Sequence, residues 1–261
     1  MTVVTDSRVA AADIDAVALK PNEMDLSLAH ELPVSTLTVD YEGREHVPAS
    51  DVLTALAAEF DCRVTVPVRA DGFDPLGDEH LRDSLPAGLG EVLVAGHSAY
   101  LSEAEGRRAV APRLGAAAEE ATDPWVGTEG VERIALAAGG TQFELLSKST
   151  ARDVRALRAA GFDGGVAVYA PTVLSNDPDT VLDAVGDYAA RRRPVRAALP
   201  DDAPEDSSIT GDARETLLDA CHEYALVGEP ARVAERISSL EDVGVNQVVA
   251  YPARGLEAVL A

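Results

Sequence analysis

Short apolar runs suited to β-strands alternate along this chain with segments whose apolar residues recur at helical spacing. Most of the runs are rich in valine and are bounded by glycine, proline or charged residues, as strands are. The longer amphipathic segments between them are predicted to be helices. The predicted strands are residues 14–19, 34–39, 63–68, 91–95, 131–137, 143–146, 166–169 and 247–251, and the predicted helices include residues 48–60, 103–121, 150–160, 177–193 and 213–224.

The region between residues 131 and 146 does not fit this alternation. The predicted strands 131–137 and 143–146 are separated only by residues 138–142, whereas a parallel crossover needs about a dozen residues. We therefore expect one of these two segments to be a helix or an arm of a hairpin. Upstream, Pro112 is expected to kink or divide the long helix predicted at residues 103–121.

The clearest local pattern lies near the C-terminus, at residues 224–252. Pro230 favours the start of a helix, because proline at the first helical position loses no hydrogen bond. Val233 and Ile237 then fall on one apolar face, with charged residues between them. The β-branched run at residues 247–251 follows and is suited to a strand buried on both faces.

This segment resembles the C-terminal signature of the bacterial-luciferase-like family. The shared residues are Gly-x-Pro-x-x-Val-Ala-Glu-Arg-Ile from Gly228, Gly-Val about seven residues later, and a Val-Val strand that ends in proline. The resemblance implies a (β/α)8 barrel that binds a flavin or deazaflavin and catalyses hydride transfer or monooxygenation. The alternative is that an unrelated α/β barrel ends in the same helix-Gly-Val-strand unit.

The repeated order of strand and helix independently favours a parallel sheet closed into a TIM-type (β/α)8 barrel. The pattern leaves open whether the barrel is regular and complete. An open doubly wound sheet is the alternative, but no Gly-x-Gly-x-x-Gly motif follows the first strand. We expect residues 1–261 to form a single barrel domain, with an acidic surface loop at about residues 198–212.

The charge of the chain indicates the salt environment of the protein and the kinds of partner that it can bind. The formal net charge is −23, the sequence pI is about 4.4, and Lys20 and Lys148 are the only lysines. An acidic surface of this kind is typical of adaptation to concentrated salt, so we infer a halophilic and archaeal protein. A basic protein partner is the alternative. Nucleic acid is excluded as a partner, because no basic footprint is present.

The remaining composition points to a cytoplasmic protein. Cys62 and Cys221 are the only cysteines and are expected to be reduced and structural. No apolar run of 18 residues and no basic-then-apolar leader is present, so neither a membrane span nor a signal peptide is predicted. The expected partner is a small-molecule substrate, and the sequence leaves open whether the chain forms a homo-oligomer.

In such a barrel, functional side chains follow the C-terminal ends of strands. Several of the predicted strands are followed by polar residues, which form the list of candidates. These are Lys20, Asn22, Glu23, Asp40, Tyr41, Arg69, Asp71, His97, Ser98, Gly139, Gly140, Thr141, Ser147, Lys148, Tyr169, Tyr251 and Arg254.

Three of these residues are predicted to be catalytic: His97, Lys20 and Arg69. His97 follows a predicted strand, and an imidazole there can act as an acid or base. Lys20 is retained in a chain almost without lysine, and Arg69 offers a second cation for an anionic substrate. The structural alternatives are a loop-fixing histidine, chance retention of lysine, and a surface ion pair of Arg69 with Asp71 or Asp74.

The resemblance also implies a cofactor site for FMN or a deazaflavin coenzyme. Gly139, Gly140 and Thr141 are the predicted phosphate-binding residues, since glycine lets backbone N–H groups approach an anion, and the ring is placed near Tyr169. An ordinary turn is the alternative for the two glycines. No metal site and no hydrolase or P-loop motif is present in the sequence. Two other functions stay open: a non-catalytic or regulatory barrel, and an aldolase or isomerase that uses lysine.

Overall fold

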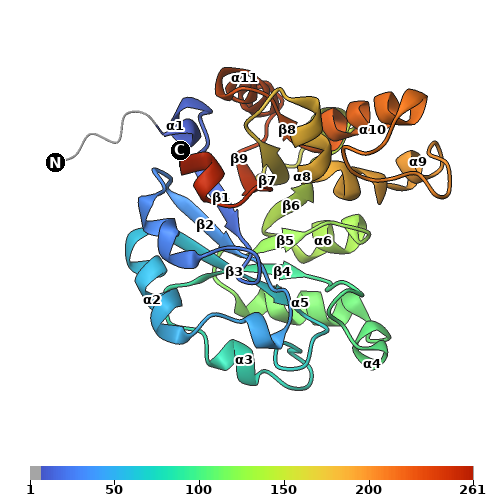
Figure 1. Ribbon diagram of the computed structural model, residues 1–261. Helices are drawn as coiled ribbons and strands as arrows, with labels where there is room; N and C mark the ends of the chain where they lie inside the picture. Colours follow the sequence, from blue (N-terminus) through green and yellow to red (C-terminus); the bar gives the residue numbers. More distant parts are fainter. Residues whose placement is uncertain (1–6, 261) are drawn as a thin grey trace.

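The computed structural model describes residues 7–260 and shows a closed barrel of eight parallel strands with helices around it (Figure 1). The strands pair in chain order from β1 to β7, and β9 closes the barrel by pairing with both β7 and β1. The predicted (β/α)8 fold is confirmed. The barrel strands are β1 Ala16–Leu19, β2 Thr36–Val39, β3 Asp61–Pro67, β4 Gly90–Val94, β5 Trp125–Gly127, β6 Thr141–Leu145, β7 Val166–Val173 and β9 Gln247–Pro252.

Helices connect the strands on the outside of the barrel (Figure 1). The expected C-terminal unit is present, with a helix that begins at Pro230 and a strand that ends at Pro252. None of the helices within residues 7–260 is long and apolar enough to span a membrane. The helices are α1 Arg8–Ala11, η1 Leu26–Glu31, η2 Arg44–His46, α2 Ser50–Glu59, α3 His80–Asp83, α4 Glu103–Gly106, α5 Val110–Glu120, α6 Glu132–Ala138, α7 Thr150–Ala159, α8 Pro178–Ala190, α9 Arg193–Arg196, α10 Gly211–Tyr224, α11 Pro230–Glu241 and α12 Glu257–Leu260.

Side chains alternate between the barrel interior and the layer under the helices. Ala16 and Ala18 of β1 pack with Val249 of β9 in the interior cluster, whereas Val17 and Leu19 pack in the larger cluster beneath the helices. This period of two follows from the pleat of a strand whose two faces are both buried. A residue that follows a strand and continues its inward-facing row therefore points into the mouth of the barrel.

One of the segments 131–137 and 143–146 was expected to be a helix or an arm of a hairpin, and this expectation is confirmed, whereas the position of the fifth strand and the effect of Pro112 were predicted wrongly. Residues 131–137 form helix α6, and the fifth strand is the three-residue Trp125–Gly127, which is too short to give a periodic signal. The chain between residues 103 and 121 is divided, but the break lies between α4 and α5 and not at Pro112. Pro112 occupies the first turn of α5, where a missing N–H breaks no helical hydrogen bond.

A helical unit follows β7 and packs around its own apolar cluster (Figure 1, α8 to α10). An extra strand, β8 (Leu226–Val227), pairs with the end of β7. Thr172 of β7 pairs with Pro252 of β9 on one edge and with Leu226 on the other, so β8 lies on the same edge of β7 as β6. The predicted acidic loop falls within this unit, where most of residues 200–208 are exposed and Ile209 is buried. The terminal residues of the expected 1–261 domain, 1–6 and 261, lie outside the described residues.

The Gly186→Ala substitution is expected to destabilise the protein by about 2 kcal/mol, as overpacking does. A methyl group on Gly186, in the middle of α8, would lie 2.2 Å from the backbone oxygen of Glu205 in the acidic loop. Gly115→Ala in α5 is the matched control, because nothing lies within 4 Å of its added methyl group. That control should gain about 1 kcal/mol from helix propensity. Urea unfolding of the two variants measures the difference, and equal stability would show that the loop does not pack on α8.

Candidate functional site

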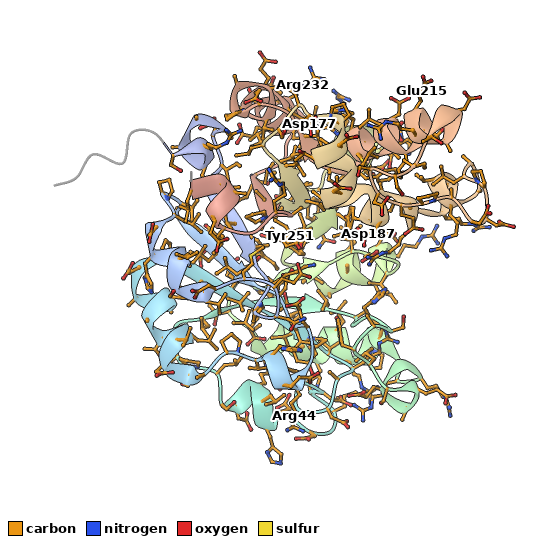
Figure 2. The ribbon with its side chains drawn as sticks, viewed as in Figure 1. Arg44, Asp177, Asp187, Glu215, Arg232 and Tyr251 are labelled. Carbon is orange, nitrogen blue, oxygen red and sulfur yellow. The ribbon has the colours of Figure 1, made fainter. Side chains whose placement is uncertain are left out.

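A cavity of about 570 Å³ lies at the C-terminal ends of the barrel strands. Its walls come from β3 to β7, from the residues that follow β1 and β2, and from α8, and its volume is within the range of about 300–1,000 Å³ typical of ligand sites. Tyr251 packs against the cluster of side chains in the barrel interior, and Figure 2 shows it near the centre of the molecule. The residues used below that line this cavity are Lys20, Asp40, Tyr41, Glu42, Gly127, Glu129, His97, Ala99, Tyr100, Phe143, Leu145, Tyr169 and Tyr188.

Strand alternation explains why the polar residues point into this cavity. Ala16 and Ala18 face the barrel interior, so Lys20 continues the same face one residue beyond β1. Thr36 and Thr38 of β2 are buried in the same way, and Asp40 continues that row at the mouth. The barrel thus places an amine and a carboxylate beside each other from adjacent strands.

Asp40 is the most perturbed acid of the site. Tyr169 donates a hydrogen bond from its hydroxyl to Asp40 Oδ2 (3.1 Å), and Thr65 Oγ1 lies 3.5 Å from Oδ1. Removal of the carboxyl from bulk water raises the pKa of Asp40 to about 7, against the opposing effects of the nearby Lys20 charge and the Tyr169 hydrogen bond. A group that titrates there can both donate and accept a proton near neutral pH.

Aromatic rings form a continuous wall of the barrel interior and its mouth. Trp125, Phe143 and Tyr169 are in successive ring contact, with centroids 5.7 and 6.0 Å apart, and Tyr251 stacks on Tyr169 at 6.1 Å. Burial is the main cause of the raised pKa of the Tyr169 hydroxyl, so this phenol remains a hydrogen-bond donor at neutral pH. The wall offers flat apolar surface to a ligand, with one polar pair at its edge.

The Lys20 amine, the predicted cation of the site, is engaged by two partners. Its Nζ lies 3.2 Å from Glu23 Oε1 and 4.2 Å from the centroid of the Tyr251 ring. The Tyr251 hydroxyl donates to the other oxygen of the same Glu23 carboxylate. Lys20 therefore lines the cavity as predicted, but its charge is compensated by an ion pair and an aromatic face.

His97, the predicted acid or base, lies at the exposed rim of the cavity. Its Nδ1 accepts a hydrogen bond from the backbone N–H of Ala99 (3.1 Å). Tyr100 packs behind it and makes an edge contact with Tyr41 at 5.1 Å. Burial raises the pKa of Tyr100 to about 12. His97 is thus inside the site but does not contact Asp40 or Tyr169 through any hydrogen bond among the described residues.

Arg69, the third predicted catalytic residue, does not line the cavity and makes no ion pair with Asp71 or Asp74 within the described chain. Its guanidinium donates to the backbone carbonyls of Ala95 (2.6 Å), Gly96 (2.9 Å) and Gly106 (2.7 Å). Arg69 therefore holds the 95–106 segment that carries His97.

The Arg69→Ala substitution is expected to cost about 2–3 kcal/mol of unfolding free energy and to expose the 95–106 segment to protease, because three carbonyl partners are lost. Arg107→Ala is the control, since Arg107 only pairs with the exposed Glu103 and should contribute about 0–1 kcal/mol. Urea unfolding and limited proteolysis measure both. Unchanged stability together with lost activity would instead support the predicted catalytic role.

Gly139, Gly140 and Thr141 lie at the opposite end of the barrel from the cavity. They connect the end of α6 to the start of β6, and the Thr141 N–H donates to the carbonyl of Pro124 just before β5. Their expected place at the mouth depended on a strand at residues 131–137, which is a helix. Of the predicted cofactor-binding residues, the structure brings only Tyr169 to the cavity.

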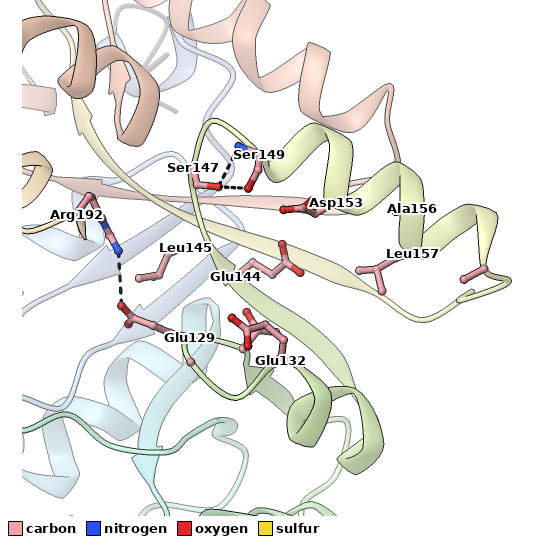
Figure 3. Close-up of a pocket in the computed structure, with 13 residues that line it drawn as sticks. Glu129, Glu132, Glu144, Leu145, Ser147, Ser149, Asp153, Ala156, Leu157 and Arg192 are labelled. Atoms are coloured by element: carbon pink, nitrogen blue, oxygen red, sulfur yellow. Dashed lines mark hydrogen bonds and ion pairs between the residues drawn. The ribbon is translucent and has the colours of Figure 1, made fainter. Parts of the chain in front are cut away.

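A second cavity of about 540 Å³ adjoins the first between α6 and α7 and shares Glu129 and Leu145 with it. Figure 3 shows Glu129 paired with Arg192 (3.6 Å) at the boundary, and Ser147 beside Ser149 at the start of α7. Lys148 is exposed and pairs with Glu223 at 3.6 Å. No cluster of potential metal ligands occurs among residues 7–260, so within them nothing contradicts the prediction of no metal site.

Asp40 was among the candidates that follow a predicted strand, but not among the residues predicted to be catalytic. Its signal was a carboxylate one residue beyond a buried strand, on the face that points inward. Tyr188 reaches the cavity from α8, and no spacing along the chain indicates that contact.

Two solved structures share this barrel over nearly their whole length. An F420-dependent secondary alcohol dehydrogenase in complex with an F420-acetone adduct has a TM-score of 0.60 and 12% sequence identity, with 93% of this chain and 94% of that chain covered. The coenzyme F420-dependent tetrahydromethanopterin reductase from Methanopyrus kandleri has a TM-score of 0.58 and 13% identity, with the same coverage. At this identity the similarity establishes the fold class alone, a (β/α)8 barrel.

The chain belongs to the Family of unknown function (DUF7388), whose model matches residues 9–259. No curated protein matches the sequence.

Proposed function

We propose that this protein is a deazaflavin-dependent oxidoreductase, which transfers hydride between a small substrate and a coenzyme of the F420 class. The observation that carries the proposal is the cavity at the barrel mouth, where aromatic walls enclose the Asp40–Tyr169 pair. The barrel is shared with two F420-dependent enzymes, and the C-terminal segment resembles the luciferase-like family. Both similarities support the same class of cofactor.

The cavity fits a flat deazaflavin ring. Phe143 and Tyr169 provide a buried aromatic wall, and Tyr41 and Tyr100 line the same cavity from the loops after β2 and β4. Asp40 and Tyr169 can supply hydrogen bonds to polar edges of the ring or of a substrate. When bound, the ring would supply the site that accepts or donates hydride, and the protein contributes binding and proton transfer.

Asp40 is the proton-transfer group in this proposal. Removal of hydride from an alcohol carbon also requires removal of the hydroxyl proton, and Asp40 is a carboxylate that lines the cavity and has a pKa raised to about 7. The hydrogen bond from Tyr169 holds Oδ2 in place, and Oδ1, whose contact with Thr65 Oγ1 is long at 3.5 Å, keeps a lone pair that can accept a proton. In the reverse direction the protonated Asp40 donates to the developing oxyanion. Tyr169 is a positioning residue for this transfer.

A Schiff-base mechanism gains no support from the lysines. Lys20 is held by Glu23 and the Tyr251 ring, and Lys148 is exposed in an ion pair with Glu223 outside the cavity. FMN is a comparison ligand rather than the proposed cofactor, because the two structural relatives are described as F420-dependent. A barrel without a cofactor is an outcome that the binding experiment below can reveal.

The acidic composition supports a protein adapted to concentrated salt, as an additional part of the proposal. The net charge of −23 implies strong self-repulsion at low ionic strength, which molar salt screens to a range of about 3 Å. The experiments are therefore designed in molar potassium chloride.

Saturating oxidised F420 is expected to raise the melting temperature of the protein by about 5–10 °C, whereas FMN at equal concentration should raise it less. A ligand at 100 times its Kd stabilises the native state by about 2.7 kcal/mol, and each kcal/mol corresponds to about 2–4 °C at this chain length. Differential scanning fluorimetry over a range of ligand concentrations measures both shifts. No shift with F420 would contradict the proposed cofactor, and a larger shift with FMN would replace it.

A further inference from the structure

We propose that the substrate of this site is an organic cation, a primary or secondary amine, which binds through the carboxylates and the aromatic faces of the barrel mouth. The inference rests on the proposed function for its reaction, but it depends for binding only on the residues of the cavity.

The first observation is the balance of charges around the cavity. Lys20 is paired with Glu23, and Arg192 is paired with Glu129, so these two cations are already compensated. Asp40 and Glu42 also line the cavity, and neither forms an ion pair within 4.0 Å among residues 7–260, although the charge of Lys20 acts on Asp40 from a greater distance. Glu42 Oε2 accepts only the backbone N–H of Asn22, at 2.9 Å. A cationic group of a ligand would supply the missing positive charge.

The second observation is that aromatic faces at this mouth already bind cations. The Lys20 amine lies 4.2 Å from the centroid of the Tyr251 ring, and the Arg192 guanidinium lies 4.3 Å from that of Tyr188. The electron-rich faces of such rings attract ammonium groups. Tyr41, Tyr100 and Tyr188 line the same cavity as the two uncompensated carboxylates.

An anionic substrate finds no comparable partner. His97 is at the exposed rim, and its Nδ1 is already used to accept the backbone N–H of Ala99. Arg69 does not line the cavity, and its guanidinium already donates to three backbone carbonyls. A carboxylate or phosphate placed beside Asp40 and Glu42 would meet like charge in a partly desolvated space, where salt screens weakly.

The reaction of an amine at this site balances with the groups already named. The ammonium form passes one N–H proton to the Asp40 carboxylate and becomes the neutral amine. An oxidised deazaflavin, when bound, would accept the hydride of the adjacent carbon, and the C–N bond would become C=N. The iminium product is hydrolysed by water after release, and the reverse sequence reduces an imine.

The test compares benzylamine, benzyl alcohol and benzoate, which share a ring and differ in charge. Saturation-transfer NMR titrations of the cofactor-free protein in potassium chloride give the three Kd values. Benzylamine is expected to bind at least about tenfold more tightly than benzoate, with benzyl alcohol between them. Glu42→Gln should reduce this ratio several-fold, whereas Glu103→Gln, on the exposed face of α4, should leave it unchanged.

The outcomes separate this inference from the proposed function. Benzoate binding as tightly as benzylamine, or a ratio unchanged in Glu42→Gln, would overturn the amine inference even if F420 binds. Selective binding of benzylamine without any binding of F420 would support the cation site and overturn the oxidoreductase proposal. With both bound, amine-dependent loss of the oxidised deazaflavin absorbance tests the reaction itself, and its absence with every amine tried would overturn the amine as substrate.

Discussion

The Asp40→Asn substitution is expected to slow deazaflavin-dependent turnover by about 10²–10⁴-fold while it stabilises the fold at alkaline pH. The rate loss follows because an amide cannot accept the transferred proton, and a general base contributes about that factor. Activity is measured with the best substrate found for the wild-type protein. The amide can still accept the hydrogen bond from Tyr169, so the loss does not require a distorted site.

The stability effect of this variant has a definite sign. Burial raises the pKa of Asp40 from 3.8 in the unfolded chain to about 7, so the native state holds the proton more tightly between these values. The free energy of unfolding of the wild type therefore falls as pH rises from about 4 to 7. The asparagine variant does not show this fall, because its side chain does not titrate. The gain at pH 8 is up to about 4 kcal/mol, because each pKa unit corresponds to about 1.4 kcal/mol.

Urea unfolding at pH 4 and pH 8 measures this difference, with Asp163→Asn as an exposed control that should change neither value. Equal stability of wild type and Asp40→Asn at pH 8 would contradict the raised pKa. Full activity of the variant would remove Asp40 from the proton-transfer role.

The Tyr169→Phe substitution is expected to raise the pKa of Asp40 by about 1–2 further units. The Tyr169 hydroxyl stabilises the ionised carboxylate through its hydrogen bond to Oδ2, and a hydrogen bond to a charged group contributes about 1.5–3 kcal/mol. Turnover that requires the ionised carboxylate should then begin at a correspondingly higher pH. Infrared titration of the protonated carboxyl band, with Asp40→Asn as the reference, measures the pKa without a substrate.

Tyr251→Phe is the matched control for this pH shift. Tyr251 stacks on Tyr169 with nearly parallel rings, but its own hydroxyl donates to Glu23 and not to Asp40. The control should therefore preserve the pKa of Asp40. A shift of similar size in both variants would show that ring packing, and not the Tyr169 hydroxyl, controls the carboxyl.

Much of the fold was predictable because strands buried on both faces give strong local signals. The runs that became β1 to β4, β7 and β9 were identified within a few residues, and Pro230 marked the start of α11. The fifth strand was missed because Trp125–Gly127 has only three residues. The apolar residues of α6 were assigned to a strand in its place. One misassigned element then placed Gly139 and Gly140 at the wrong end of the barrel.

The candidate site was predictable only in part, because it depends on contacts between distant segments. Lys20, His97 and Tyr169 line the cavity since the C-terminal ends of parallel strands meet at one end of a barrel. The raised pKa of Asp40 could not be predicted from the sequence. It depends on the burial of the carboxyl and on a hydrogen bond from Tyr169, which is 129 positions away. Arg69 looked like a ligand-binding cation, because no local pattern shows that three carbonyls surround it.

Fluorescence titration of the protein with oxidised F420 tests the central claim most directly, when it compares wild type with Ala99→Trp and Leu136→Trp. Ala99 lines the mouth of the cavity and is exposed, so a tryptophan there narrows the site without filling the core, whereas Leu136 is an exposed residue of α6 that does not line the cavity. The account predicts one saturable site in wild type and Leu136→Trp, and binding weakened at least about tenfold in Ala99→Trp. Equal binding by all three proteins would place the ligand elsewhere, and no binding by wild type would contradict a deazaflavin site in this barrel.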